Sequence, residues 1–312
     1  MTPSTDRIVV TGGAGFIGSH LVDRLLAEKQ AEIVVLDNLS SGLLSNLAQH
    51  GTEQRLRFIE GDIRDPAVAT AALSAASVVY HLAGRARAAD ALHEVEDTFA
   101  SNVVGTFNVL RAAAVHEVQR VVFTSSYAVY GEPIALPVEE SHPLLAMDCH
   151  GASKVAAEAY CRAFRRVFGL HTVILRLARV YGPRDHDTVI PNWVHQAASG
   201  QDLCVQGGQQ VLDFVWIDDA VEALVRAGEP TGPLPAINIA SGTGTRIADV
   251  ARLIRRLAGG HGQIKVLPAR SIEATRFIGS VERMREVLKL EPPLDPLAHL
   301  GTLLPAAAAV AR

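Results

Sequence analysis

Three glycines stand at intervals of three residues in the run TGGAGFIGSH, directly after a short apolar stretch. Gly12, Gly15 and Gly18 permit a tight turn and let backbone N–H groups approach a pyrophosphate closely. The phosphates would then lie at the positive N-terminus of the helix that follows. The spacing therefore indicates a loop that binds a dinucleotide.

An aspartate at the end of the second apolar run supports this interpretation. Asp37 closes EIVVLD, nineteen residues beyond Gly18. A carboxylate at this place accepts hydrogen bonds from both hydroxyls of an adenosine ribose and repels a 2′-phosphate. We therefore expect NAD rather than NADP as the cofactor. The alternative role of Asp37 is to cap the loop that continues as NLSSG.

The elements that must position these groups follow from the hydrophobic pattern. Six runs rich in apolar, β-branched residues read as strands, at 7–11, 32–37, 56–62, 77–84, 120–126 and 171–176. Apolar residues recur at helical spacing over 15–30, 106–118 and 151–169. The last of these helices has a natural stop in Gly169. Apolar strands that alternate with helices predict an α/β fold with a Rossmann-type, doubly wound parallel sheet.

The pattern changes after about residue 180, where proline and glycine punctuate the chain, as in GEPTGPLPA. We predict an NAD-binding Rossmann domain over residues 1–178, with contributions to its sheet from about 213–240. Residues 179–312 are then mainly a smaller C-terminal lobe that binds substrate.

Composition excludes several classes of protein. The 312 residues are 48% hydrophobic and 20% charged, which is typical of a globular chain. The net charge of −4, from 29 basic and 33 acidic residues, argues against nucleic acid or an anionic membrane as partner. No run approaches the roughly 20 apolar residues that span a bilayer. Three cysteines without a C-x-x-C pair favour a reducing cytoplasm and no metal site.

Ten stretches, in this order, resemble the extended short-chain dehydrogenase/reductase family and its NAD-dependent nucleotide-sugar epimerase/dehydratase branch. They are TGGAGFIGSHL, VVLDNLSSG, EGDIRD, YHLAG, NVVGTFNVLRAA, VVFTSSYAVYG, GASK, ILRLARVYGPR, DFVWIDDAVEAL and ARSIEATR. The resemblance runs from about residue 6 to 295.

The resemblance implies a set of contacts to NAD. Adenine would lie against Asp62 and Ile63, and the nicotinamide beside Leu82, Ala83 and Gly84. The full expected cofactor set is Gly12, Gly15, Phe16, Ile17, Gly18, Asp37, Asn38, Ser41, Gly42, Asp62, Ile63, Leu82, Ala83, Gly84, Asn102, Ser125 and Lys154.

The resemblance also implies the catalytic groups. Ser126 matches the catalytic Ser/Thr of the family, and Ser125 beside it is an expected substrate contact. Lys154 matches the lysine of a Tyr-x-x-x-Lys pair, whose members lie one helical turn apart and point the same way. In the family this lysine binds the nicotinamide ribose and lowers the pKa of the tyrosine. Four residues before Lys154, however, stands His150.

Three hypotheses account for this histidine. In the first, His150 is the general acid/base, since imidazole has an ordinary pKa of about 6.5 and a nearby lysine would lower it further. Its shorter reach would require a deeper substrate or a bridging water. In the second, Tyr127 moves the proton, with His186 and Asp187 as weaker candidates. In the third, the oxidation chemistry is lost: the protein binds a nucleotide sugar without turning it over, or His150 is a substitution.

Other departures from the family concern the substrate. Leu212 occupies the place of an arginine that binds the pyrophosphate of the sugar nucleotide, and an apolar side chain cannot replace a guanidinium there. Arg179, in place of an asparagine, could supply positive charge from the opposite wall. Arg270 and Glu273 match the second phosphate arginine and an acid that contacts the nucleotide ribose. These departures suggest a reshaped phosphate site, or a substrate other than an ordinary nucleoside diphosphate sugar.

The favoured function is a cytoplasmic, homodimeric, NAD-dependent epimerase that acts at C4 of a nucleotide sugar through a 4-keto intermediate. Dehydratases of the branch carry an Asp-Glu pair where this chain has Tyr127 and Ala128, and Arg184 is the one candidate for the carboxylate clamp of a decarboxylase. The alternatives are a keto-sugar reductase or dehydrogenase, a sugar dehydratase, or a silent nucleotide-sugar binder. The family dimerises through the helices expected at about 102–116 and 150–168.

Overall fold

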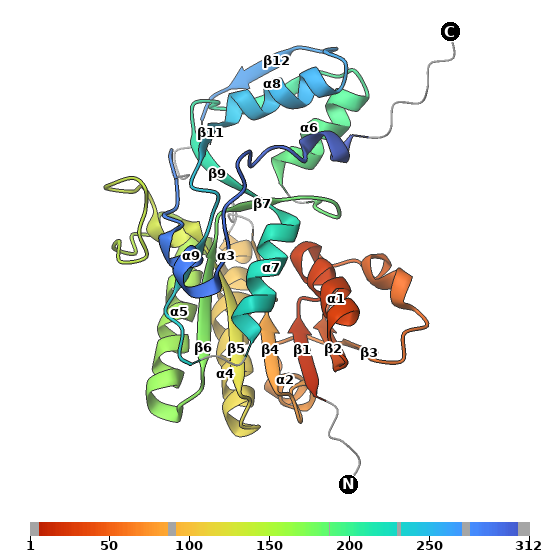
Figure 1. Cartoon of the computed structure of the whole chain (residues 1–312), viewed down its shortest axis with the longest axis vertical. Coiled ribbons are helices and arrows are strands. Elements are labelled where there is room, and N and C mark those ends of the chain that lie inside the picture. The colour runs from red at the N-terminus through yellow and green to blue at the C-terminus, as the bar shows by residue number, and fades with distance from the viewer. Residues whose placement is uncertain (1–5, 87–91, 187, 230–231, 270–274, 305–312) are drawn as a thin grey trace.

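The computed structural model of the chain describes residues 6–86, 92–186, 188–229, 232–269 and 275–304. A sheet flanked by helices forms the larger body, and a smaller lobe stands above the carboxyl ends of its strands (Figure 1). Within the described ranges, no helix combines the length and apolar character needed to cross a bilayer. The same ranges contain no group of three His, Cys, Asp or Glu side chains placed to hold a metal ion.

The main sheet of the described chain has seven strands in the order β10-β6-β5-β4-β1-β2-β3. Every neighbouring pair is parallel. The strands are β1 (Arg7–Thr11), β2 (Glu32–Asp37), β3 (Leu56–Glu60), β4 (Val78–His81), β5 (Arg120–Ser126), β6 (Thr172–Leu177) and β10 (Ile237–Ile239). The predicted doubly wound parallel sheet is confirmed. β4 ends at His81 rather than at residue 84, because residues 82–84 have no partner in the register with either neighbouring strand.

Both faces of this sheet are buried, which explains the continuous apolar runs. Ile8 and Val10 belong to one hydrophobic cluster and Val9, between them, to the other. Successive side chains of a strand point to opposite faces, so a strand covered on both sides needs apolar residues at every position.

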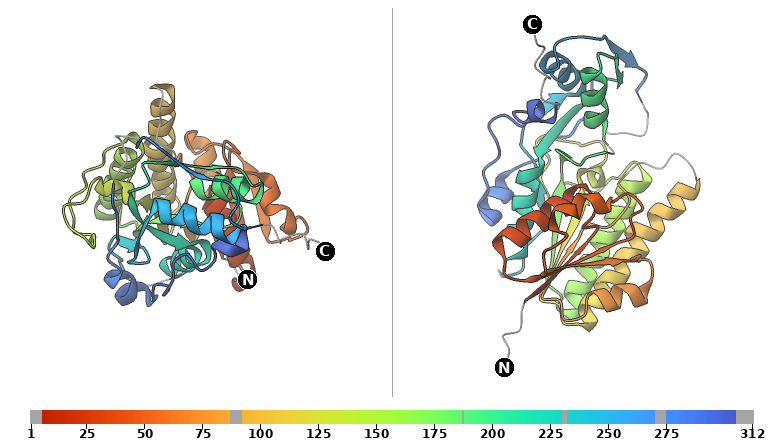
Figure 2. Two further views of the ribbon diagram at one scale, coloured as in Figure 1. Left: turned by 90° about the horizontal axis from the view of Figure 1, so that it is seen from above. Right: turned by 90° about the vertical axis from the view of Figure 1, so that its right-hand side faces the viewer.

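Helices cover each face of the sheet (Figure 2). On one face lie α1 (Phe16–Glu28) and α7 (Ile217–Gly228). On the other lie α2 (Pro66–Ala72), α4 (Thr106–Val115) and α5 (Cys149–Phe168), with α3 (Leu92–Phe99) and the π-helical turn η2 (Ala100–Gly105) beside α5. The expected stop of α5 is confirmed, since Gly169 caps it in the left-handed conformation, with φ of 70°.

The chain leaves the larger body after β6 to build the lobe. A three-stranded sheet contains β7 (Arg179–Tyr181), β9 (Val211–Trp216) and β11 (Gly244–Arg246), and β8 (Leu203–Gln206) pairs with β12 (Ile264–Leu267). In the lobe, α6 (Val189–Ala198) and the 3₁₀ turn η4 (Leu300–Leu303) contact α8 (Ile247–Leu257). The other elements of the described ranges contact the larger body: α9 (Glu282–Leu288) contacts β10, the 3₁₀ turn η1 (Leu44–His50) contacts α1, and the 3₁₀ turn η3 (Tyr127–Tyr130) contacts α5. Within 213–240, α7 and β10 return to the larger body while β9 stays in the second sheet. The division at residue 178 stays a prediction.

Candidate active site

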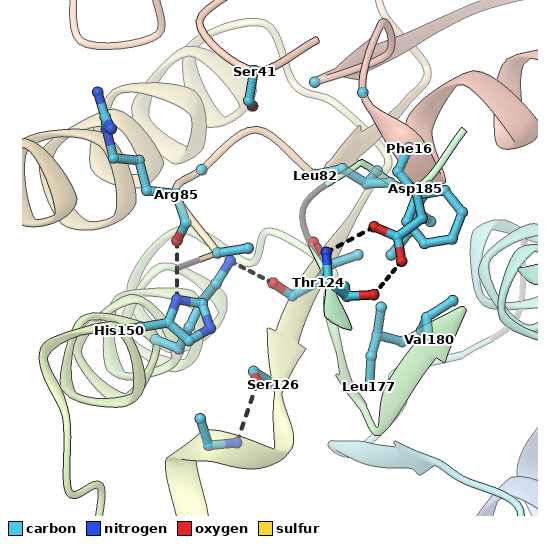
Figure 3. A pocket seen from close by; sticks show the side chains of 18 of the residues that line it. Phe16, Ser41, Leu82, Arg85, Thr124, Ser126, His150, Leu177, Val180 and Asp185 are labelled. Atoms are coloured by element: carbon cyan, nitrogen blue, oxygen red, sulfur yellow. Dashed lines mark hydrogen bonds between the residues drawn. The ribbon is translucent and has the colours of Figure 1, made fainter. Parts of the chain in front are cut away.

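A cavity of about 1100 Å³ opens at the carboxyl ends of the parallel strands and reaches into the lobe (Figure 3). This is where ligands bind in doubly wound folds. Most of the expected site residues line it: Gly12, Gly15, Phe16, Ile17, Gly18, Asp37, Asn38, Ser41, Gly42, Asp62, Ile63, Leu82, Ala83, Gly84, Ser125, Ser126, His150, Lys154 and Arg179. Arg270 and Glu273 lie outside the described residues.

The glycine loop is packed so closely against neighbouring backbone that no side chain fits at Gly12 or Gly18. Gly12 has φ of 74°, and a Cβ there would lie 2.7 Å from the backbone nitrogen of Ala83. A Cβ on Gly18 would lie 2.1 Å from the carbonyl oxygen of Gly12. Gly15, the N-cap of α1, has no side chain to occupy the N–H groups of the first turn. These groups therefore remain available to an anion in the cavity.

Asp37 joins two loops and also lines the cavity. Its carboxylate accepts hydrogen bonds from the backbone N–H groups of Ala14 and Leu39, both at 2.9 Å. Burial raises the pKa of this carboxyl above its ordinary value. Asp37 therefore caps the loop and also lies at the cavity, where a residue that binds the adenosine ribose is expected. Nearby, Asn38 donates to Asp62 at 2.9 Å, and hydrogen bonds from Arg64 lower the pKa of Asp62 to about 2.

Lys154 is buried and points at the end of β5. Its ammonium donates to the carbonyl oxygen of Thr124 at 2.9 Å and lies 4.9 Å from the ring centre of Phe123. Burial lowers the pKa of Lys154 to about 8. The lysine therefore carries its charge at neutral pH although its side chain is buried.

His150 stands one turn before Lys154 on α5 and is 8% exposed. Its Nδ1 lies 2.9 Å from the carbonyl oxygen of Arg85 (Figure 3). A carbonyl oxygen only accepts, so Nδ1 carries the proton, and in the neutral ring the lone pair lies on Nε2. No described residue donates to Nε2. Burial, followed by the charge of Lys154, lowers the pKa of His150 to about 4.

The two serines at the end of β5 have different partners. Ser126 accepts a hydrogen bond from the N–H of Ala128 at 3.2 Å and so caps the turn η3. Ser125 donates to Glu158 at 2.7 Å, and Glu158 forms a buried, two-pronged ion pair with Arg176 at 2.7 and 2.9 Å. The hydroxyl proton of Ser125 is therefore committed to the protein.

Asn102 is the expected cofactor contact, among those described, that does not line the cavity. It lies behind Gly84, whose added Cβ would come 2.6 Å from the Asn102 side-chain oxygen. Its amide bonds the backbone of Arg85 instead.

The other candidates for moving a proton are less well placed. Tyr127 lines the cavity, but its ring packs on Phe277 with 5.0 Å between the ring centres. His186 lines the cavity and is exposed. Asp187 lies outside the described residues.

Comparison with known proteins agrees with this geometry. Residues 8–240 match the model of the NAD dependent epimerase/dehydratase family. The chain belongs to this family. The predicted family, its enzymatic character and NAD as its cofactor are thereby confirmed.

Relatives within the epimerase/dehydratase family differ in reaction. The chain is 35% identical to a UDP-glucose 4-epimerase of Mycolicibacterium smegmatis, over 92% of this chain and 93% of the relative. It is 33% identical to UDP-glucuronic acid decarboxylase 6 of Arabidopsis thaliana, over 93% and 85%. The crystal structure of UDP-glucose 4-epimerase from Thermotoga maritima, with UDP-glucose, superposes with a TM-score of 0.88 at 30% identity, over 95% and 96% of the two chains.

The departures of this family member from the expected pattern also face the cavity. Leu212, on β9, is buried in the lobe wall, and Arg179 lies on β7, which pairs with β9. The lobe wall further contains Trp193, Gln206 and Gln210, which no motif indicated. Thr124 and Arg85 were also missed, because each contributes a backbone carbonyl that any residue type could supply.

Proposed function

We propose that this protein is an NAD-dependent 4-epimerase of a UDP-hexose, with His150 as the acid/base. The observation that carries the proposal is the tautomer of His150, because the Arg85 carbonyl leaves Nε2 as a proton acceptor inside the cavity. The relatives named as UDP-glucose 4-epimerases support the reaction and the nucleotide.

The chain divides the work among three side chains. His150 Nε2 takes the proton of the reacting sugar hydroxyl and returns it after the sugar has turned over. Ser126, whose oxygen already accepts from Ala128, keeps its own proton to donate to that hydroxyl oxygen. Lys154 adds a positive charge beside the cofactor ribose and disfavours the protonated imidazole.

The cofactor site fits NAD. Backbone atoms occupy the space that a Cβ would need at Gly12 and Gly18, and the first turn of α1 faces the cavity. Asp37 would hold the adenosine ribose and Leu82 to Gly84 the nicotinamide. NAD, when bound, supplies a reversible hydride acceptor for the sugar carbon.

Two observations favour epimerisation over the other reactions of the family. Tyr127 and Ala128 occupy the places of the acidic pair expected of a dehydratase, and neither can act as a carboxylic acid. Arg184, the candidate carboxylate clamp of a decarboxylase, pairs at 2.8 Å with Asp23 on α1. Its charge is thus already partly neutralised.

The substrate pyrophosphate would lie near Arg179, opposite Leu212, with Arg270 and Glu273 as further proposed contacts. We propose that the enzyme is a cytoplasmic homodimer. The free thiols of Cys149, Cys161 and Cys204 are compatible with a reducing compartment.

The test is turnover of a panel that contains UDP-glucose, UDP-galactose, UDP-N-acetylglucosamine, UDP-glucuronic acid and dTDP-glucose, with products separated by chromatography. We expect interconversion of a C4-epimeric UDP pair by the parent protein and its loss in His150→Phe. Release of CO₂ from UDP-glucuronic acid, or a 4-keto-6-deoxy product from dTDP-glucose, would contradict the proposal. An inert parent with an active His150→Tyr variant would favour the silent binder.

A further inference from the structure

Asn102 forms an unusual set of contacts one layer behind the cavity. It lies in the π-helical turn η2 and is 1% exposed. Its side-chain oxygen accepts from the N–H of Arg85 at 2.7 Å. Its Nδ2 donates to the carbonyl oxygen of Arg85 at 2.9 Å and to Ser153 Oγ at 2.8 Å. Both amide hydrogens of Asn102 are thereby used. Its side chain bonds the N–H and the carbonyl oxygen of Arg85 together, as the backbone of a neighbouring strand would.

The carbonyl that Asn102 holds is the one that His150 uses. The carbonyl oxygen of Arg85 accepts hydrogen bonds from Asn102 Nδ2 and from His150 Nδ1, both at 2.9 Å, so its two lone pairs are occupied. Ser153, the other partner of Asn102, donates to the carbonyl oxygen of His150 at 2.7 Å. The amide therefore contacts both the acceptor of the imidazole proton and the turn of α5 that carries the imidazole.

A chain of buried hydrogen bonds fixes Asn102 to the centre of the sheet. Thr106 Oγ donates to the carbonyl oxygen of Asn102 at 2.6 Å, so it accepts from His81 Nε2 at 2.9 Å. His81 Nδ1 then accepts from Thr11 Oγ at 2.7 Å. Burial lowers the pKa of His81 to about 3, so this ring stays neutral. Thr11 ends β1, directly before the glycine loop.

We propose that Asn102 is a positioning residue that sets the tautomer of His150 by holding the Arg85 carbonyl toward Nδ1. The inference deepens the proposed function, because it assumes that His150 Nε2 is the working base. Without Asn102, the Arg85 backbone loses both of the hydrogen bonds that Asn102 makes with it and keeps, among the described residues, only that of His150. Nδ1 would then lose its fixed acceptor, and the lone pair would be shared between the two ring nitrogens.

The direct test is nitrogen NMR of the holoenzyme labelled with ¹⁵N in its histidine rings, at pH 7.5. The signals of His150 are assigned by their absence in His150→Phe. We expect a protonated Nδ1 and an unprotonated Nε2 in the parent protein. In Asn102→Ala and in Asn102→Asp, which keeps the size but lacks the donor, we expect a mixture of the two tautomers or the opposite one.

Ser153→Ala is the matched control. It removes one hydrogen bond of Asn102 but leaves the Arg85 carbonyl in place, so the Nδ1–H signal should persist. With UDP-glucose as the probe, kcat of Asn102→Ala should fall about 10- to 100-fold, less than the loss of a general base itself would cost, with a smaller change in KM. Bound NAD, measured by its release on denaturation, shows whether the variant keeps its cofactor site.

The outcomes separate the two proposals. A parent protein with protonated Nε2, or an Asn102→Ala variant that retains the parent tautomer, would overturn the positioning role. A tautomer that changes as expected in a protein that turns over no sugar would support the positioning role and contradict the proposed epimerase.

Discussion

At the scale of single residues, burial keeps the His150 imidazole neutral, and the Arg85 carbonyl oxygen determines which ring nitrogen carries the proton. A phenol in this place would need a neighbouring cation to become a base at neutral pH, whereas imidazole is already one. Burial lowers the pKa of His150 most, and the same Lys154 that would activate a tyrosine lowers it further, so the histidine stays neutral. The charge of Lys154 therefore favours the deprotonated form of either side chain, a phenolate or a neutral imidazole.

The pH dependence of kcat/KM follows from these two groups. His150 accepts a proton only when neutral, and its pKa is lowered to about 4, so activity should rise through about pH 4 rather than 6.5. It should fall again above about pH 8, where Lys154 loses its charge. Initial rates with UDP-glucose across pH 3.5–9.5 test this. A lower limb near pH 6.5 would contradict it, and His150→Tyr should move that limb upward.

Individual elements carry requirements that single residues do not reveal. The turn between β1 and α1 requires glycine at positions 12 and 18, because backbone atoms fill the space that a Cβ would need. Helix α5 carries His150, Lys154 and Glu158 four residues apart, so the face that supplies the site also supplies, one turn further on, the carboxylate of the buried ion pair with Arg176. Each element can be tested by a change that leaves the reacting groups in place.

Gly18→Ala should weaken NAD binding at least about tenfold, or by some 1.4 kcal/mol. The added methyl would lie 2.1 Å from the Gly12 carbonyl oxygen, so the loop must move. Titration with NAD of protein freed of nucleotide gives the affinity. Gly51→Ala is the control, because its Cβ would meet Ala48 at 3.4 Å and Gly51 has an ordinary helical conformation. Equal affinities in the two variants would refute the role of the turn.

Glu158→Ala should lower the free energy of unfolding by about 3–5 kcal/mol, because it leaves the buried Arg176 guanidinium without its carboxylate. Arg162 also pairs with Glu158, at 3.1 Å, but its side chain is 51% exposed. Arg162→Ala should therefore change the free energy of unfolding by less than about 1 kcal/mol. Denaturant titrations of both variants provide the comparison, and similar losses would argue against the buried pair.

At the scale of the whole molecule, an apolar surface on α4 and α5 supports the proposed homodimer. Phe107 and Tyr160 are 37% and 41% exposed and contact each other edge to face, with ring centres 5.5 Å apart. Val167 and Phe168, at the end of α5, are exposed as well. Apolar side chains gathered in this way commonly mark an interface between proteins.

A second chain would bury this surface, so the double variant Phe107→Glu, Tyr160→Glu should be monomeric. Light scattering after gel filtration should give the chain mass of 33.3 kDa for the variant and twice that mass for the parent. Leu294→Glu, at a fully exposed position that belongs to neither α4 nor α5, should leave the parent mass unchanged. A monomeric parent protein would contradict the dimer.

The sequence predicted the larger body of the molecule better than the lobe. Continuous apolar strands and the glycine loop are local signals, so the sheet, its first helix and the stop at Gly169 could be recognised directly. The lobe strands β7 and β8 have only three and four residues and pair with segments distant in the sequence, which leaves no local pattern. The resemblance alone places Asn102 among the cofactor contacts; its hydrogen bonds to the Arg85 backbone could not be predicted, because backbone contacts leave no trace in residue types.

The late position of β10 also matters while the protein is being made. The edge of β6 is covered by Ile237–Ile239, sixty residues after Leu177. At ordinary rates of translation, an apolar strand edge thus waits about 3–12 s on the ribosome for its neighbour. A nascent chain stalled within the lobe would expose this edge, so we expect chaperones to bind there and fragments that end near residue 178 to aggregate.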